Sequence, residues 1–217
     1  MILVPVKNLN GAKQRLSSIL DPPERVELAH AMCEDVLGAI AAWQGRPPVT
    51  VVTSDPYARS LARHFAFDVI ADETNSSETD AIQMATNVCC AQDVESLLVV
   101  PADIPMIETA ELEQIAAAAP ERGTVLVPDA AGRGTNAAWK SPAGLFPLRF
   151  GNDSFLPHQA AARATGLPCV VLQLPGIALD VDRPDDLLAL ASAHGSRRSQ
   201  KLARSWNLEQ RKQACHG

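Results

Sequence analysis

The sequence predicts an α/β domain built on a largely parallel β-sheet. Strand-like and helix-like segments alternate along the chain from its first residues. Residues 97–100 are apolar throughout, which is typical of a strand buried on both faces of a parallel sheet. The length of 217 residues suits one domain, and residues 1–195 contain neither an internal repeat nor a linker. We therefore expect one domain over residues 1–195, followed by a basic C-terminal tail over residues 196–217 that is flexible or helical.

Six elements are expected in the first half of the chain. Residues 2–6 predict a buried strand. The helix after it has Asp21 as its N-cap, Pro22 in its first turn and Glu24 at the capping-box position, and its apolar residues recur at helical spacing. The remaining elements are a strand at 49–53, a short helix with Leu61, Ala62 and Phe65 facing inward, a strand at 67–70, and a helix at 81–90 that follows the polar run 72–80.

The second half continues the alternation. The apolar strand at 97–100 stops at the turn 101–105, and Thr109 is expected to cap a helix that runs through residue 119. Two further strands, 125–128 and 136–140, are joined by a turn-rich segment. The last expected elements are a helix that starts at Asp153 or Ser154, a strand at 169–172, and a helix from Pro184 through Ala193.

Composition and cysteine usage exclude several classes of protein. Apolar residues make up 47% of the chain and charged residues 20%, so the chain can form a core and is not disordered. The longest uncharged apolar stretch, residues 97–102, is too short to span a membrane. The chain begins with strand-like residues instead of a secretory signal, and its five cysteines form no C-x-x-C pair. We expect a cytoplasmic protein.

Charge is distributed unevenly along the chain, whose net charge is −6. The tail from Ser196 holds six basic residues and one acidic residue, which leaves 13 basic and 24 acidic residues in the body. An acidic body makes a nucleic acid a poor partner, and we expect neither nucleic-acid nor membrane binding. The tail could still touch either of them, but a solvated or disordered C-terminus is the simpler interpretation.

Three acidic residues are expected where open α/β sheets place their sites, at the carboxyl ends of strands. Asp103 follows the most apolar strand, and Asp180 and Asp182 precede the last expected helix. On an extended segment, residues i and i+2 point to the same face, so these two carboxylates can converge. Carboxylate oxygens suit Mg²⁺ that shares phosphate oxygens with a substrate. In the alternative interpretation, Asp182 caps the helix at Pro184 and Asp103 fixes a turn.

A loop that carries cations follows the first strand. Lys7, Lys13 and Arg15 stand there among small and polar residues, a setting that suits a polyphosphate. The loop contains neither a Walker motif nor a G-x-G-x-x-G motif. A solvated surface loop is the alternative interpretation.

Two glycine-bearing turns, 132–136 and 150–155, also contain hydroxyl residues. Backbone N–H groups of residues 151–154 could hold an anion at a helix N-terminus, although an ordinary Ser or Asp cap explains the pattern as well. No nucleophile elbow or activated cysteine is present in the sequence. His158 is the histidine nearest to a candidate site, and a packing role is expected for it more than a role as a base.

The ordered set of motifs resembles the 2-phospho-L-lactate guanylyltransferases of deazaflavin coenzyme F420 biosynthesis, including relatives that use phosphoenolpyruvate or 3-phosphoglycerate. The motifs are Val4-Pro5-Val6-Lys7, Ala12-Lys13-x-Arg15-Leu16, Val52-Thr53-x-Asp55, Pro101-Ala102-Asp103-x-Pro105, Gly134-Thr135-Asn136, Phe150-Gly151-x-x-Ser154-Phe155 and Leu179-Asp180-Val181-Asp182-x-Pro184. The resemblance covers residues 1–193 and leaves out the tail. It implies a single-domain, Rossmann-type fold of the MobA-like nucleotidyltransferases, with a mixed, mostly parallel sheet.

The resemblance also implies an activity and a site. GTP and a phosphorylated three-carbon acid would give a guanylyl diphosphate ester and pyrophosphate, with Mg²⁺ as cofactor and a homodimer as a reasonable state. The implied residues are Asp103, Asp180 and Asp182 for the metal; Lys13, Asp103 and Asp182 for catalysis; Thr135, Gly151 and Ser154 for the acid; and Lys7, Lys13, Arg15, Thr53, Asp55 and Asn75 for the nucleotide. The family's Gly-Leu-Asn helix start is replaced here by the polar run 73–80, in which Asn75 is the matching residue.

The residue inventory agrees with this chemistry. A substrate phosphate is already largely ionised at pH 7, so it attacks without a general base. The step needs in-line positioning and neutralisation of charge on the transferred and departing phosphates. Two other functions stay open: transfer to another acceptor, such as molybdopterin or a sugar phosphate, and a non-catalytic nucleotide-binding module. The sequence does not distinguish among the three acids.

Overall fold

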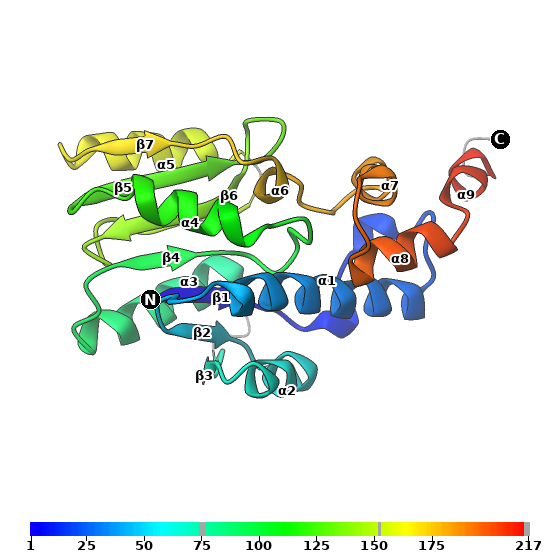
Figure 1. Cartoon of the computed structure of the whole chain (residues 1–217), viewed down its shortest axis with the longest axis horizontal. Helices are drawn as coiled ribbons and strands as arrows, with labels where there is room; N and C mark the ends of the chain where they lie inside the picture. The colour runs from blue at the N-terminus through cyan, green and yellow to red at the C-terminus, as the bar shows by residue number, and fades with distance from the viewer. Residues whose placement is uncertain (74–76, 152, 215–217) are drawn as a thin grey trace.

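A seven-stranded mixed sheet, with helices on both faces, forms the centre of the computed structural model, which describes residues 1–73, 77–151 and 153–214 (Figure 1). The strand order is β3-β2-β1-β4-β6-β5-β7. The strands are β1 (Ile2–Pro5), β2 (Val49–Val52), β3 (Asp68–Ile70), β4 (Leu97–Val99), β5 (Gly123–Pro128), β6 (Thr135–Ser141) and β7 (Cys169–Val171). Strand β6 runs antiparallel to its neighbours β4 and β5, whereas the other pairings are parallel. The first residues of β6 therefore lie at the edge where the parallel strands end.

Successive apolar side chains of the central strands point to opposite faces of the sheet and form a hydrophobic core on each face. In β1, Ile2 and Val4 point into a core that includes α1 (Pro22–Ala42), α2 (Pro56–His64) and α4 (Thr109–Ala118). Leu3 points into a second core, on the other face, with α3 (Glu78–Ala91) and α5 (Phe155–Ala164). Figure 1 shows the two helix layers on either side of the sheet. Each fully buried aliphatic side chain stabilises the fold by about 1.5–3 kcal/mol.

Local capping signals explain where several helices start. The predicted capping box between Asp21 and Glu24 is confirmed. The helix expected from residue 81 begins three residues earlier, because Ser77 and Asp80 form a capping box of their own. Thr109 does not cap α4: Glu108 is the N-cap, and the Thr109 hydroxyl instead donates to the Ala39 carbonyl at 2.9 Å, which ties α4 to α1. The short helix α6 (Pro175–Ala178) was not predicted.

The C-terminal region is helical and packed, so the solvated or disordered interpretation of the tail is wrong for residues 196–214. Beyond α7 (Pro184–Ser192), the chain forms α8 (Arg198–Ser205) and α9 (Leu208–Ala214). Ala203, Trp206 and Leu208 are buried in a third hydrophobic core, which includes Leu28 and Met32 of α1. Helix α8 contacts both α1 and α7, at the right of Figure 1.

The arginines of this region bind groups of the body. Arg198 contacts the Glu34 carboxylate at 2.6 Å, and Arg211 contacts both oxygens of Glu24 at 2.7 and 2.9 Å. Arg204 donates to backbone carbonyls at the end of α7. Arg198 and Arg211 thus pair with carboxylates of α1, and Arg204 pairs with backbone carbonyls. Among the described residues, no helix is both long and apolar enough to cross a membrane.

Candidate active site

Two adjoining cavities open at the edge where the parallel strands end. The larger one, of about 390 Å³, is the β6-side cavity, and its walls include Arg15, Thr135, Gly151, Ser154 and Asp180. The smaller one, of about 250 Å³, is the β1-side cavity, and its walls include Lys7 and Lys13 from the loop after β1. Asp103, Asp182 and Glu78 line both cavities. These carboxylates therefore stand at the boundary between the two spaces, as expected for ligand sites in open α/β sheets.

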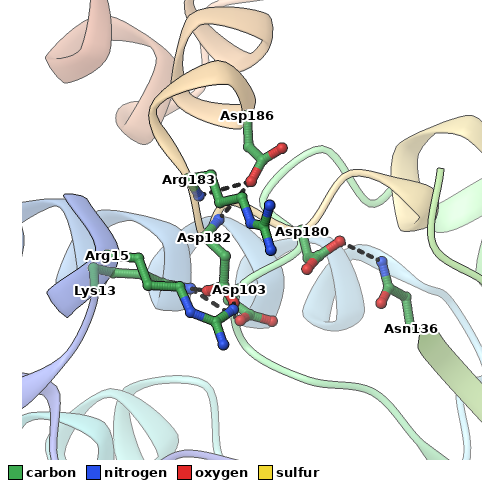
Figure 2. A network of polar contacts seen from close by, with 8 residues as sticks. All are labelled: Lys13, Arg15, Asp103, Asn136, Asp180, Asp182, Arg183 and Asp186. Atoms are coloured by element: carbon green, nitrogen blue, oxygen red, sulfur yellow. Dashed lines mark hydrogen bonds and ion pairs between the residues drawn. The ribbon is translucent and has the colours of Figure 1, made fainter. Parts of the chain in front are cut away.

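Lys13 joins the two boundary aspartates. Its Nζ lies 2.9 Å from Asp103 Oδ2 and 2.9 Å from Asp182 Oδ1, and Arg15 reaches the second oxygen of Asp182 at 3.2 Å (Figure 2). Burial by itself lowers the pKa of Lys13, but the charges and hydrogen bonds of the two aspartates outweigh it and raise that pKa. The backbone of Lys13 is left-handed, with φ of 56°, which is strained for a residue other than glycine. The fold holds this ammonium firmly between the two carboxylates.

The alternative structural roles of Asp103 and Asp182 are not observed. The side chain of Asp186, not that of Asp182, accepts from the backbone N–H groups of Asp182 and Arg183 at the start of α7 (Figure 2). The Asp103 carbonyl accepts from the Val181 N–H at 3.1 Å, which fixes the loop after β4 beside the segment before α7. Lys13 and Arg15 lower the pKa of Asp182 against the opposing effect of burial. Both carboxylates are left to bind cations.

Asp180 faces a different partner. Asn136 Nδ2 donates to Asp180 Oδ1 at 3.2 Å and also to the carbonyls of Ile177 and Ala178. Burial raises the pKa of Asp180, while the hydrogen bond from Asn136 opposes that rise. Asp180 and Asp182 thus do not converge on one point as their spacing predicts, and within the described ranges no three His, Cys, Asp or Glu side chains form a group that could hold a metal ion.

The donor set nevertheless fits a hard cation. The side chains of Asp103 and Asp182 are 35% and 37% exposed, and a positive group already stands within hydrogen-bond distance of both. Carboxylates of this kind suit Mg²⁺, which keeps several waters and shares phosphate oxygens with a substrate. Asp103 and Asp182 are therefore compatible with a divalent cation.

Neutral groups meet at one wall of the β6-side cavity, whose lining also includes charged residues such as Asp129, Arg133 and Asp153. Ser154 Oγ accepts from the Thr135 N–H at 3.0 Å, so the Ser154 hydroxyl joins the start of α5 to the start of β6 instead of capping its own helix. His158, on the first turns of α5, is 2% exposed and contacts Thr135 Oγ1. The structure thus gives His158 the packed position that the sequence favours. Gly151 has φ of 136°, a conformation that side chains other than glycine rarely adopt.

Of the residues expected at the nucleotide, Lys7 and Lys13 line the β1-side cavity and Arg15 lines the β6-side cavity, whereas Thr53 and Asp55 have structural roles. The Thr53 hydroxyl accepts from the Asp55 N–H, and Asp55 caps α2 through the Ala58 N–H and also holds the Leu9 N–H. Thr53 and Asp55 are buried, and neither belongs to the described lining of the two cavities. Their expected contact with a nucleotide is thus not supported. Lys7 pairs with Asp72 at 3.2 Å, whereas Asn75 lies outside the described residues.

Glu78 is a site residue that the sequence analysis missed. It was assigned to the polar loop, but it occupies the first turn of α3 and lines both cavities. Burial raises the pKa of Glu78 to about 7, and the negative charge of Asp103 adds to this rise. The capping pattern from Ser77 to Asp80 was the available signal, because it places a helix start, and hence Glu78, at this edge of the sheet.

A mixed seven-stranded sheet with helices on both faces is also the fold of solved nucleotidyltransferases, one of them from Methanothermobacter with a TM-score of 0.59 and 18% identity. The chain belongs to the family described as "Guanylyl transferase CofC like", whose model matches residues 1–212. The match includes most of the tail, so the expectation that the family resemblance ends before residue 196 is wrong.

Curated relatives and solved structures agree with this placement. A phosphoenolpyruvate guanylyltransferase of Sphaerobacter thermophilus is 37% identical over 190 residues, which cover 87% of this chain and 91% of the relative. A 3-phospho-D-glycerate guanylyltransferase of Colwellia psychrerythraea is 31% identical and covers 94% of this chain and 98% of its own. The fold is similar to that of a proposed nucleotide-diphospho-sugar transferase from Desulfovibrio desulfuricans G20, with a TM-score of 0.77, 17% identity, and 98% and 96% of the two chains covered.

Proposed function

We propose that this chain transfers the guanylyl group of GTP to the phosphate of a small phosphorylated acid and releases pyrophosphate, as a step in deazaflavin coenzyme F420 synthesis in the cytoplasm. One observation carries the proposal: two cavities with different linings share a wall made of Asp103, Asp182 and Glu78. The β1-side cavity, which contains Lys7 and Lys13, suits the nucleotide triphosphate, and the wall of the β6-side cavity formed by Thr135, Gly151 and Ser154 suits the acid. The two substrates then meet at the carboxylates.

The reaction needs positioning and charge neutralisation more than proton transfer. An oxygen of the acid's phosphate attacks the α-phosphorus of GTP, the bond to the β-phosphate breaks, and the electron pair leaves with pyrophosphate. A phosphate monoester is largely ionised at pH 7, so it carries its own nucleophilic charge. Lys7 and Lys13 supply positive charge in the β1-side cavity, and Arg15 adds positive charge beside Asp182 at the boundary of the two cavities. His158 is buried and bonded to the protein through both ring nitrogens, which supports a mechanism without a histidine base.

The proposal includes Mg²⁺ as the cofactor. Asp103 and Asp182 are the residues that would hold it, and Asp180, which the family resemblance adds to the set, lines the same β6-side cavity. When bound, a divalent cation would neutralise negative charge on the phosphoryl groups and polarise them. Lys13, which contacts both aspartates, would supply positive charge to the phosphates at the same boundary.

The acid would bind through Thr135, Gly151 and Ser154 of the β6-side cavity. The relatives are named for phosphoenolpyruvate, 3-phospho-D-glycerate and 2-phospho-L-lactate. These three acids share a phosphate and a carboxylate on a three-carbon frame. Any of them presents two anionic groups to a pocket that offers hydrogen-bond donors.

Pyrophosphate release tests the proposal directly. Purified protein with GTP and Mg²⁺ is assayed with each of the three acids, and again with ATP or CTP in place of GTP. We expect release with at least one acid and only with GTP. Pyrophosphate release with molybdopterin or a sugar phosphate, but with none of the three acids, would show that the enzyme uses another acceptor. Tight GTP binding without release in any mixture would instead indicate a non-catalytic module.

A further inference from the structure

His158 connects the segment before the glycine turn to the start of β6. Its Nε2 lies 2.8 Å from the backbone nitrogen of Arg149, and its Nδ1 lies 2.9 Å from Thr135 Oγ1. The neighbouring Lys140 is 1% exposed and donates to the Phe146 carbonyl at 2.7 Å, so the same segment is anchored a second time. These contacts place a buried imidazole directly behind a residue of the β6-side cavity.

The bond to Arg149 fixes the tautomer of the ring. A backbone N–H is always a donor, so Nε2 must accept and cannot carry a proton. A neutral imidazole has one N–H group, which is then on Nδ1 and points at Thr135 Oγ1. Burial and the charge of Lys140 keep the ring neutral by lowering the pKa of His158 to about 4. The hydroxyl oxygen of Thr135 is therefore the acceptor in this contact.

The Ser154 hydroxyl, like that of Thr135, accepts a hydrogen bond from the protein. The Thr135 N–H donates to Ser154 Oγ, so this hydroxyl is also used as an acceptor. A hydroxyl whose oxygen accepts keeps its own hydrogen for another partner. Thr135 and Ser154 are 4% and 5% exposed and both line the β6-side cavity. These two bonds use neither hydroxyl hydrogen, so each of them can be donated to an oxyanion in the cavity.

We infer that His158 is a positioning residue for the acid substrate: it holds Thr135 as a hydrogen-bond donor to an oxyanion and keeps the segment around Arg149 against β6. The inference rests on the proposed function, because it concerns the same acid-binding cavity. His158 does not touch the substrate. It acts through the Thr135 hydroxyl on one side and through the backbone at Arg149 on the other.

Two half-conservative variants separate these contacts. In His158→Asn, the side-chain amide can still donate to Thr135 from near the Nδ1 position, but it falls short of Arg149. In His158→Gln, the amide oxygen can reach the Arg149 N–H, but the donor to Thr135 is lost. We expect the KM for the acid to rise about 10- to 100-fold in His158→Gln and to stay within a few-fold of wild type in His158→Asn. The KM for GTP and the melting temperature change little in either variant.

A double-mutant comparison shows whether His158 acts through Thr135. Thr135→Val removes the hydroxyl and keeps the side-chain shape, whereas Thr135→Ser keeps the hydroxyl. We expect Thr135→Val to raise the KM for the acid as much as His158→Gln does, Thr135→Ser to retain most of the affinity, and the double variant to be no worse than either single variant. Equal losses in both KM values and in thermal stability, with fully additive effects, would show that His158 has only a structural role and would overturn the inference.

A measurement without turnover keeps this inference separate from the proposed function. Nitrogen-15 NMR of the imidazole reports the tautomer of His158 in the free protein, and we expect the Nδ1–H form at pH 7. Inorganic phosphate, titrated as the probe, should shift the His158 and Thr135 signals in wild type and bind more weakly to His158→Gln. An Nε2–H tautomer, or equal phosphate binding by both proteins, would overturn the inference. Absence of pyrophosphate release together with the expected NMR result would instead overturn only the proposed function.

Discussion

Around Lys13, on one side of the cleft, charged side chains hold one another, whereas around His158, on the other side, neutral groups form hydrogen bonds with one another and with the backbone. Lys13, Asp103 and Asp182 form ion pairs across loops that are 90 and 169 residues apart in sequence. Three hydrogen bonds connect the neutral groups: the Arg149 N–H donates to His158, His158 donates to the Thr135 hydroxyl, and the Thr135 N–H donates to the Ser154 hydroxyl. Charged groups can exchange one ionic partner for another, but a chain of neutral bonds keeps one geometry. The first side is suited to receive a cation and a triphosphate, and the second to recognise one small anion.

The largest expected effect comes from removing a carboxylate on the charged side. Asp182→Asn keeps the side-chain volume but removes the charge that faces Lys13 and Arg15. We expect the rate of pyrophosphate release to fall by at least about 10³-fold, since stabilisation of phosphoryl charge is the main part of such catalysis. The control is Glu113→Gln, which removes an exposed carboxylate from α4. A near-wild-type rate for Asp182→Asn, with normal circular dichroism, would show that Asp182 is not part of the metal site.

Lys13→Met separates two roles of the Lys13 ammonium: it neutralises Asp103 and Asp182 in the protein without metal, and it supports turnover. Without Lys13, Asp103 and Asp182 lose the cation that neutralises them, so the protein without metal should lose about 2 kcal/mol of unfolding free energy. Mg²⁺ should restore more stability to this variant than to wild type, because it no longer competes with the lysine. Turnover should still fall by about 10²-fold. Thermal unfolding with and without Mg²⁺ measures the difference, and Lys201→Met, on an exposed part of α8, is the control. Equal Mg²⁺ shifts in wild type and Lys13→Met would contradict the exchange of partners.

The neutral side predicts a dependence of stability on pH. The pKa of His158 is lowered from 6.5 to about 4, so the folded state favours the neutral ring. A group of this kind contributes its full stabilisation above pH 6.5 and loses it as the pH falls toward 4, because the unfolded chain binds the proton more tightly. Between pH 7 and pH 4, wild type should lose about 3 kcal/mol more unfolding free energy than His158→Gln. Urea unfolding at the two pH values measures this. Parallel losses in the two proteins would show that the ring is not buried in its neutral form.

Arg15→Ala should have the smallest effect. The Arg15 side chain is 52% exposed, and its ion pair with Asp182 is therefore screened by water and salt. We expect an unfolding free energy within about 0.5 kcal/mol of wild type and a KM for GTP that rises a few-fold, more at low salt than at high salt. Steady-state kinetics at two ionic strengths gives the comparison. A rise in the KM for the acid alone would show that Arg15 acts on the acid in the β6-side cavity, which it lines, and not on GTP.

The elements of the sheet and the positions of most loops follow from local signals in the sequence. The box between Asp21 and Glu24 and the apolar run 97–100 are examples, because capping and burial pattern act within a few residues. The end of β4 and the start of the antiparallel strand β6 also place Asp103 and Thr135 at the same edge of the sheet.

Partners that are distant in sequence could not be predicted in this way. Asn136, rather than the neighbouring Asp182, sets the position of Asp180, and the acidic side chains that receive the basic tail lie on α1. The hydroxyls of Thr109 and Ser154 find tertiary partners instead of capping their helices. Choices between a local and a distant partner depend on packing, which a single sequence does not reveal.

A crystal structure with Mn²⁺, a non-hydrolysable GTP analogue and the preferred acid tests the comparison most directly. The account predicts an anomalous manganese peak at Asp103 and Asp182, with Lys13 Nζ moved from the carboxylates to a phosphate oxygen. It also predicts that the bonds of His158 to Thr135 and Arg149 are unchanged and that the acid lies beside the Thr135 hydroxyl. A manganese peak elsewhere would contradict this account. So would a structure in which Lys13 still bridges the two aspartates and the acid has changed the contacts of His158. Either result would show that the site is not divided into a charged side that exchanges partners and a neutral side that keeps its geometry.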